Sequence, residues 1–207
     1  MKLTLCLFVL LLFLSSATAI NGQTKIKEFR SISCPEKKWA LKHLFVANSA
    51  FRATKEARKQ TNSLLTDSVL DQYINGGKID AFRHVFWMAL LTTKIGEKKA
   101  RSLGNAHEKG NYLFFLRGKN EEGEPSDSIS GIMDLNNNEI GILIGKSNPK
   151  IDINQLKLVV IDSIKEGKCL ILKRNAEGKK VNCKGEIATS AKKWGLPYCL
   201  IKSNESP

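Results

Sequence analysis

The sequence predicts a mainly α-helical protein made of a single helical domain with a small C-terminal β-hairpin. Three observations support this fold class: apolar residues recur at helical spacing over most of the chain, no internal repeat or composition break divides it, and a turn between two short apolar runs lies near its end. The length of 207 residues suits one domain, because a chain of this size buries most of its apolar surface in one core.

Residues 1–19 are expected to be a signal peptide. Lys2 precedes an apolar run over residues 3–14, and residues 15–19 read Ser-Ser-Ala-Thr-Ala, which is typical of a cleavage site. A retained membrane anchor is the alternative, but this run is shorter than the roughly 20 residues that span a bilayer. The sequence therefore predicts a secreted or periplasmic protein, with its domain over residues 20–207 and no transmembrane segment in the mature chain.

The first predicted helix starts at residues 33–36, which read Ser-Cys-Pro-Glu and have the form of a capping box with proline in the first turn. Apolar residues then recur at roughly helical spacing as far as Ala57, which predicts one long or kinked helix ending near Thr61. A short helix is expected over residues 67–74, before the turn Asn-Gly-Gly at residues 75–77.

The strongest helical pattern runs from Lys78 to Ile95. This segment is apolar on more than one face, and helices of that kind lie in the middle of a domain. We therefore expect it to be the central helix of the core. After Gly96, residues 97–110 predict another helix, with small and apolar residues on one side.

The last third of the chain contains a loop, a helix and the hairpin. The polar stretch over residues 118–130 is expected to be a surface loop. Asp152 can cap a helix that Gly167 terminates. Two short strands are predicted between Cys169 and Cys183, around an Asn-Ala-Glu-Gly turn.

Four cysteines remain once Cys6 leaves with the signal peptide. An even number in an exported protein permits two disulfides, although four cysteines allow three pairings. The predicted hairpin favours Cys169 with Cys183, and Cys34 would then pair with Cys199. Zinc binding by these thiols is disfavoured because the chain has no C-x-x-C pair.

The charge balance indicates an anionic partner. The chain has 33 Lys and Arg residues against 20 Asp and Glu residues, so its formal charge is +13. A surface this basic concentrates polyanions, and the expected partner is an anionic polymer such as nucleic acid, or a phospholipid headgroup. The composition, 42% hydrophobic and 26% charged, excludes a disordered tail, a fibre and a multi-span membrane protein. It does not determine the oligomeric state.

A polar cluster interrupts the predicted central helix. Asp80, His84 and Trp87 share one face of this helix at helical spacing, and Arg83 lies next to them in sequence. Titratable groups on a mostly apolar helix need partners, because a buried polar group without a hydrogen bond or ligand costs free energy.

Two further polar clusters follow along the chain. His107 and Glu108 lie toward the end of the next helix, which an antiparallel turn near Gly96 would bring back toward the first cluster. The third cluster lies in residues 133–141, which read Met-Asp-Leu-Asn-Asn-Asn-Glu-Ile-Gly. The arrangement predicts that side chains from all three clusters meet.

Each cluster also has a structural interpretation. His84 taken alone is as consistent with a hydrogen-bonded core histidine as with a ligand, and His107 suits the last turn of a helix. The asparagines can cap helices. A calcium loop does not fit residues 133–141, because Glu139 stands where glycine is required and Gly145 where a bidentate glutamate is required.

Residues 75–87, 104–112 and 133–141 resemble a bacterial domain family of unknown function marked by DAFRHxxW, AHE and MDLxNNxxG motifs. Members of that family look like exported proteins and toxin-associated modules, and the resemblance covers about residues 75–145. It implies the following candidate site residues: Asp80, Arg83, His84, Trp87, His107, Glu108, Asp134, Asn137, Asn138 and Gly141.

The first functional hypothesis is a secreted hydrolase, with or without a divalent metal, that acts on a phosphodiester in nucleic acid or phospholipid. The order of its polar residues is similar to that of helical metal-dependent phosphohydrolases, although those have His-Asp where this chain has His-Glu. The predicted metal ligands are His84, His107, Glu108 and Asp134. Arg83 would stabilise phosphate charge, and Asp80 would orient a histidine. Without a metal, a histidine would act as general base beside Asp80 or Glu108.

The second hypothesis is a non-catalytic helical binding module at the cell envelope. Its polar residues would form a buried network that includes Trp87, Asn137, Asn138 and Gly141, and its charge would bind an anionic surface. Convergence of imidazoles and carboxylates beside an open cleft favours catalysis, whereas internal pairing without access favours binding. A serine hydrolase is disfavoured because the chain has no G-x-S-x-G motif.

Overall fold

The computed structural model confirms a mainly α-helical fold with a two-stranded antiparallel hairpin near the C-terminus. It describes residues 28–118, 120–121, 124–125, 127–188, 194–195 and 197–205, so the predicted signal peptide lies outside the described residues. The helices are α3 (Cys34–Lys42), α4 (Leu44–Leu64), α5 (Lys78–Ile95), α6 (Glu97–Leu116), α7 (Ser128–Ser147) and α8 (Ile153–Lys165). The strands are β1 (Asn120–Glu121), β2 (Glu124–Pro125), β3 (Leu170–Leu172) and β4 (Leu200–Lys202), paired β1 with β2 and β3 with β4.

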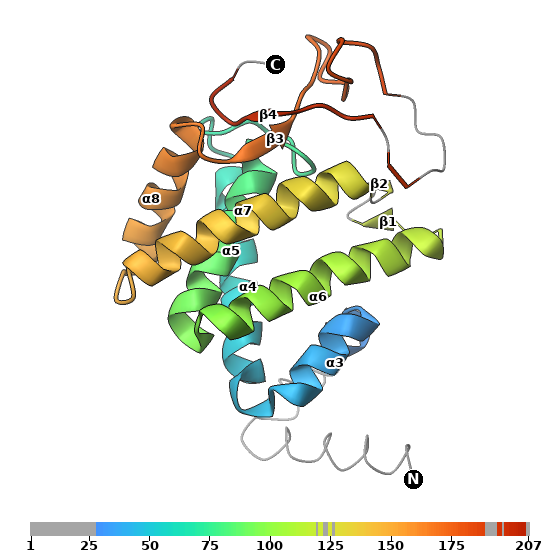
Figure 1. The fold of residues 1–207 in the computed structure, drawn as a ribbon. Helices are drawn as coiled ribbons and strands as arrows, with labels where there is room; N and C mark the ends of the chain where they lie inside the picture. Colours follow the sequence, from blue (N-terminus) through green and yellow to red (C-terminus); the bar gives the residue numbers. More distant parts are fainter. Residues whose placement is uncertain are drawn as a thin grey trace.

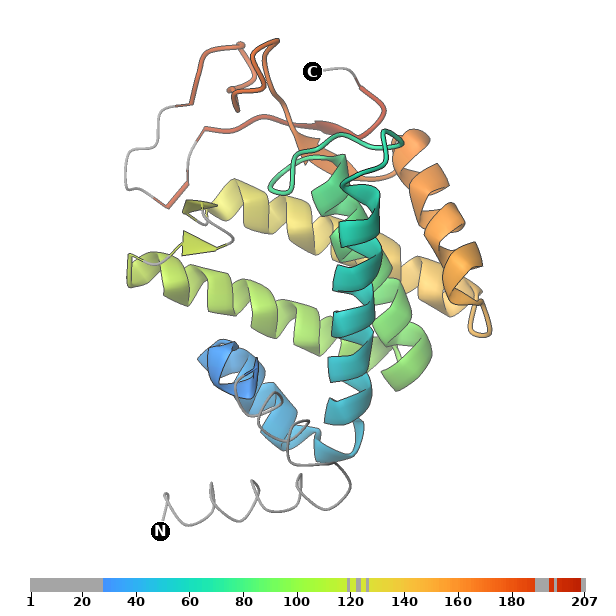
Figure 2. The same ribbon diagram turned by 180° about the vertical axis from the view of Figure 1, so that it is seen from behind.

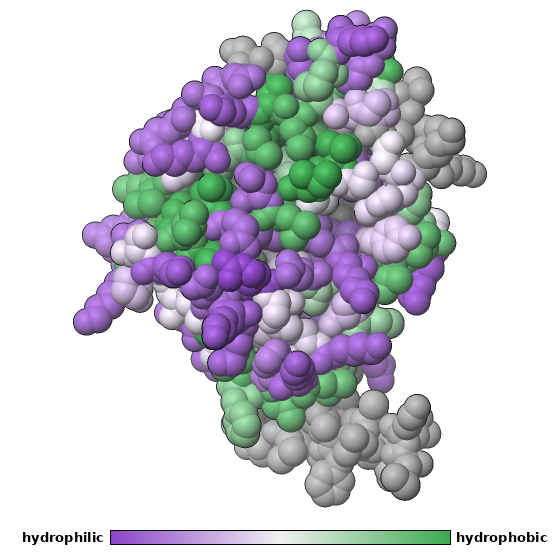
Figure 3. Space-filling model, viewed as in Figure 1, coloured by the Kyte–Doolittle hydropathy of each residue, from purple (hydrophilic) through white to green (hydrophobic). Residues whose placement is uncertain are grey.

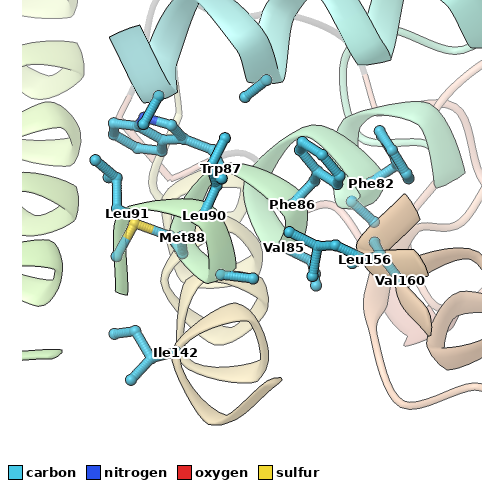
Figure 4. Close-up of a cluster of buried hydrophobic side chains, with 14 of the residues drawn as sticks. Phe82, Val85, Phe86, Trp87, Met88, Leu90, Leu91, Ile142, Leu156 and Val160 are labelled. Atoms are coloured by element: carbon cyan, nitrogen blue, oxygen red, sulfur yellow. The ribbon is translucent and has the colours of Figure 1, made fainter. Parts of the chain in front are cut away.

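Helix α5 runs through the centre of the protein and has the bounds that its apolar pattern predicts. Helix α4 crosses one side of it, whereas α6 and α7 lie on the opposite side (Figures 1 and 2). Phe82, Phe86 and Met88 of α5 are fully buried in one hydrophobic cluster with Ile142 of α7 and Val160 of α8 (Figure 4). The apolar character of α5 on several faces is therefore explained by packing on several sides.

Helix α7 approaches the backbone of α5 very closely, and two glycines permit the approach. A Cβ atom on Gly141 would lie 2.3 Å from the Val85 carbonyl oxygen, and one on Gly145 would lie 2.6 Å from that of Ala89. No real side chain tolerates such distances, so any larger residue pushes the helices apart. The close approach brings the polar side chains of α7 up against the central helix.

The N-terminal helices follow the prediction at their start but not along their length. The capping box is confirmed, because the Ser33 side chain accepts the backbone N–H of Glu36 and the Glu36 carboxylate accepts that of Ser33. The predicted long or kinked helix is divided into α3 and α4 at His43, whose backbone leaves the helical region with φ −123° and ψ 45°.

The short helix predicted over residues 67–74 is wrong, because this segment consists of turns and bends. Its Asp71 is used as a cap instead. The Asp71 carboxylate accepts the backbone N–H of Tyr73 at 3.1 Å and that of Lys78 at 2.8 and 2.9 Å. These side-chain-to-backbone bonds offer the segment an alternative to helical hydrogen bonds.

The segments flanking α7 also differ in detail from the prediction. Helix α6 extends to Leu116, beyond the expected end at residue 110. The expected loop over residues 118–130 contains the pair β1–β2 and ends where Asp127 caps α7. The predicted Asp152 cap of α8 is confirmed, because its carboxylate accepts the backbone N–H groups of Asn154 and Gln155.

The predicted disulfide pairing is wrong, and the structure joins Cys183 to Cys199 instead. The reason is the partner of β3, which pairs with residues 200–202 rather than with the chain beyond the turn at residues 175–178. The backbone of Cys199 accepts the Lys173 N–H and donates to the Val181 carbonyl. Cys199 therefore lies between these two segments, beside Cys183.

The other two cysteines form no disulfide. Cys34 is exposed in the first turn of α3, whereas Cys169 is buried just before β3. Burial raises the pKa of the Cys169 thiol to about 12, outweighing the opposite effect of Lys168. Within the described part of the chain, no helix is long and apolar enough to cross a membrane.

Candidate metal centre

Three titratable side chains meet between α5 and α7. Asp80 and His84 lie one turn apart on α5, and Asp134 faces them from α7. One ligand atom of each lies within 4.8 Å of those of the other two, and all three residues are buried. This Asp80–His84–Asp134 group is called the carboxylate–histidine cluster below.

His84 is the centre of the cluster. Its Nε2 atom lies 3.5 Å from Asp80 Oδ1 and 3.4 Å from Asp134 Oδ1. Its Nδ1 atom lies 3.2 Å from Asn138 Oδ1, an oxygen that only accepts hydrogen bonds. With the amide in this orientation, Nδ1 carries a proton. Nε2 then faces two carboxylates and needs either a second proton or a cation.

The distances around Nε2 favour a cation. A charge-assisted N–H···O bond measures about 2.7–2.9 Å, which is well below the 3.4 and 3.5 Å observed. Four ligands held tetrahedrally at about 2.1 Å from a zinc-like ion lie about 3.4 Å apart. The two carboxylates therefore lie at the spacing of metal ligands from His84 Nε2, and one nitrogen with two carboxylates is a donor set that divalent ions accept.

Asp80 is held in place from two directions. One carboxylate oxygen accepts the Gly76 N–H at 2.6 Å, and the other accepts the Arg83 guanidinium at 2.5 Å. The carbonyl of Gly76 in turn accepts the backbone N–H of Leu172 in β3 at 2.8 Å. The position of this carboxylate thus depends on the C-terminal hairpin, and Arg83 offsets part of its charge.

His107 lies beside the cluster but outside the group of possible ligands. The centre of its ring is 6.2 Å from that of His84 and 5.4 Å from that of Trp87. Its Nδ1 lies 3.1 Å from Glu36 Oε1. Burial raises the pKa of Glu36, but the hydrogen bond and charge of His107, together with the bonds from Ser33, outweigh it and lower this pKa to about 2.

Glu108 lines a small pocket of about 200 Å³ that also reaches Asp134. Its carboxylate accepts a hydrogen bond from the Asn111 side chain at 3.3 Å. The described lining residues are Glu108, Asn111, Asp127, Ser128, Ser130, Gly131, Ile132, Asp134, Leu135 and Trp194. The pocket gives the otherwise buried cluster a route to its surroundings through Asp134.

The residues predicted to form a buried polar network have separate tasks. The Trp87 indole donates to Thr54 of α4 at 2.9 Å. The Asn137 amide pairs with the backbone of Leu170, donating to its carbonyl and accepting its N–H. Gly141 permits the close contact of the two helices, and Asn138 contacts His84.

The structure thus brings together part of the predicted site. Of the predicted metal ligands, His84 and Asp134 converge, and Asp80 joins them in place of His107 and Glu108. Glu36 was assigned only a capping role by its sequence, because nothing local links it to a histidine 71 positions away. The one signal for this contact is that Glu36 caps α3, a helix that packs against α6.

The fold and the site define a mainly α-helical protein with a candidate metal centre between its two most closely packed helices. A family model matches residues 37–168, and the chain belongs to that family, which is described as a domain of unknown function (DUF6973). The matched region contains the whole carboxylate–histidine cluster and ends before β3. It is longer than the resemblance seen in the sequence, which covers about residues 75–145. No curated protein and no solved structure matches the chain.

Proposed function

We propose that the protein is a metal-dependent hydrolase that acts on a phosphodiester-type anionic substrate. Asp80, His84 and Asp134 would bind the divalent ion. The observation that carries this proposal is the spacing around His84 Nε2, which fits metal ligands and is too long for a charged hydrogen bond. The pocket beside Asp134 supports it by giving a substrate access.

The neighbouring side chains have roles that follow from their contacts. A bound divalent ion would activate water and offset the charge of a phosphate. Arg83 holds Asp80, and Asn138 holds His84 with Nε2 directed at the carboxylates. Glu108 lines the pocket, where a carboxylate can transfer protons to or from the reacting group.

The charge of the pocket is a second argument for a metal. Glu108, Asp127 and Asp134 are among its lining residues, and no lysine or arginine is among those that the structure describes. A divalent ion held by Asp134 would offset negative charge where a phosphate enters the pocket. The strongly basic protein as a whole would still attract anionic substrates from a distance.

A non-catalytic module with a buried polar network is the second candidate, and one observation favours it. His84 is only 2% exposed, which suits a structural role. Rotation of the Asn138 amide would let its nitrogen donate to Nδ1 and would place the imidazole proton on Nε2, between the two carboxylates. The cluster would then be an internal hydrogen-bond network without a metal.

Metal content decides between the two candidates. The protein would be stripped with chelator, reloaded with zinc or manganese, desalted and measured by elemental analysis. We expect about one ion per chain, lost in Asp80→Asn and Asp134→Asn and retained in Asp152→Asn, which changes a capping carboxylate on α8. A folded protein, verified by circular dichroism, that takes up no ion would overturn the metal-dependent mechanism.

Export to an extracytoplasmic compartment is part of the proposal. It is supported by the pattern of residues 1–19 and by the disulfide between Cys183 and Cys199, since disulfides persist in oxidising compartments. Fractionation of expressing cells, with N-terminal sequencing of the exported protein, tests it. A protein that stays in the cytoplasm with residues 1–19 attached would contradict this part.

A further inference from the structure

The outer face of α7 carries an apolar strip that leads to the pocket. Ile132, Leu135 and Leu143 are 53%, 40% and 56% exposed, and Glu139 between them is paired with Arg101. At 1.5 Å per residue, the strip from Ile132 to Leu143 is about 16 Å long. Figure 3 shows hydrophobic side chains on the face of the molecule that carries α7.

An aromatic group forms another edge of the same pocket. The Trp194 ring packs against Tyr112 and Phe115 of α6, at centre-to-centre distances of 4.8 and 5.0 Å. Tyr112 is 40% exposed and Trp194 is 37% exposed. Tryptophan and tyrosine in such positions are typical of surfaces that contact the boundary between lipid and water, because each has an apolar ring and a polar edge.

The strip and the aromatic group both continue into the candidate site. Ile132, Leu135 and Trp194 line the pocket together with Asp134, which belongs to the carboxylate–histidine cluster. The exposed Lys109 lies one turn before Tyr112 on α6, where its charge complements an anionic surface. Exposed apolar side chains therefore line an acidic pocket, and an exposed lysine lies on the helix that carries Tyr112.

We infer that the substrate is a phospholipid presented at a membrane or micelle surface. Its headgroup would enter the pocket, and its apolar part would lie along the strip on α7. The inference rests on the proposed hydrolase function and narrows its substrate class. A nucleic acid suits the pocket less well, because single strands are bound by basic grooves with stacking aromatic rings, and the described lining contains no basic residue.

Binding to vesicles tests the surface independently of catalysis. Chelated protein would be sedimented with vesicles of phosphatidylcholine and phosphatidylglycerol. Leu143→Glu is expected to weaken binding about tenfold, because it places a charge in the strip. Leu158→Glu, a change at an equally exposed leucine on α8, is the matched control and should bind like the wild type. Equal binding of the two variants, or no binding by the wild type, would overturn the inference.

Activity separates failure of the inference from failure of the proposed function. The metal-loaded protein would be offered the same vesicles, single-stranded DNA and a soluble aryl phosphodiester. Hydrolysis of the vesicle phospholipid at least about tenfold faster than that of DNA supports the inference. Hydrolysis of DNA or the soluble diester without that of vesicles overturns the lipid assignment and leaves the hydrolase proposal standing. No hydrolysis of any of them contradicts both.

Discussion

Two histidine–carboxylate contacts lie side by side in this protein and differ in kind. His107 and Glu36 are 3.1 Å apart, a hydrogen-bonded pair at the contact between α3 and α6. His84 is more deeply buried, yet its Nε2 stays 3.4 and 3.5 Å from two carboxylates. A buried charge pair normally closes to hydrogen-bond distance, because desolvation strengthens the attraction. The open spacing at His84 is the observation on which the proposed metal site rests.

The largest expected effect is the difference between the variants that remove the His84 and His107 imidazoles. His84→Ala should abolish metal binding and lower the hydrolysis rate by more than about 100-fold, because it removes the central ligand. His107→Ala should keep the bound ion and lower stability by about 1–2 kcal/mol through loss of a charged hydrogen bond. Elemental analysis, steady-state rates and urea unfolding measure the three quantities. Equal loss of the metal in both variants would contradict the assignment of His84 as a ligand and His107 as a residue outside the metal site.

A methyl group between α5 and α7 tests how far the spacing at His84 depends on helix packing. Gly141→Ala should destabilise the protein by about 2 kcal/mol and weaken metal binding, because its Cβ would meet the Val85 carbonyl at 2.3 Å. Gly131→Ala is the control on the same helix. Its Cβ would have 3.9 Å to the nearest atom, so helix propensity should make it neutral or stabilising by about 0.5–1 kcal/mol.

Thermal and urea unfolding would show the difference between the two glycines. If Gly141→Ala were as stable as Gly131→Ala and bound metal as tightly, the close approach of the helices would not be what positions Asp134.

The pH dependence of stability reports on the Glu36–His107 pair. The pKa of Glu36 is about 2 in the folded protein, below its ordinary value of 4.5, so the ionised carboxylate stabilises the fold. This contribution, on the order of 2 kcal/mol, is present above pH 4.5 and is lost as the pH falls toward 2. Glu36→Gln should therefore be less stable than the wild type at pH 7, with a smaller difference at pH 3. A difference independent of pH would argue against the pair.

The smallest expected effect is a difference in thiol reactivity between Cys34 and Cys169. Cys34 follows Ser33 of the capping box, whereas Cys169 precedes Leu170, which Asn137 holds. Burial raises the pKa of the Cys169 thiol to about 12, so it should not react with a thiol reagent at pH 8 in the native protein. In a protein that starts at Ile20, one thiol should react before unfolding and two after it. Two reactive thiols in the native state would contradict the burial of Cys169.

Local sequence patterns predicted the elements that are determined by residues close together in the sequence. Helix α5 was predicted with its true bounds because a mostly apolar segment lies between the turn at residues 75–77 and Gly96. The Asp152 cap and the Ser33 capping box depend on residues three apart, and both were predicted from sequence. The break at His43 was not, because its flanking residues all suit a helix and the tertiary packing alone decides where the chain turns.

Contacts between distant residues account for what was missed. The sequence predicted that Asp134 meets His84. It did not show that Asp80, rather than His107 or Glu108, would be the third member of the group, because this depends on how the helices pack. The pairing of Cys183 with Cys199 depends on the strand that β3 selects, 30 residues further along the chain. Glu36 was overlooked as a partner of His107 for the same reason, since its local role already explained it.

The link from β3 to the cluster sets the order in which the site can be completed. Leu172 holds Gly76, Gly76 holds the Asp80 carboxylate, and Asn137 clasps the backbone of Leu170. Leu170 and Leu172 are synthesised about 90 residues after Asp80. A chain that is still emerging, or one truncated before Leu170, contains all three residues of the cluster but not the strand that orients them. Residues 170–172 therefore complete the hydrogen-bonded arrangement that holds the Asp80 carboxylate.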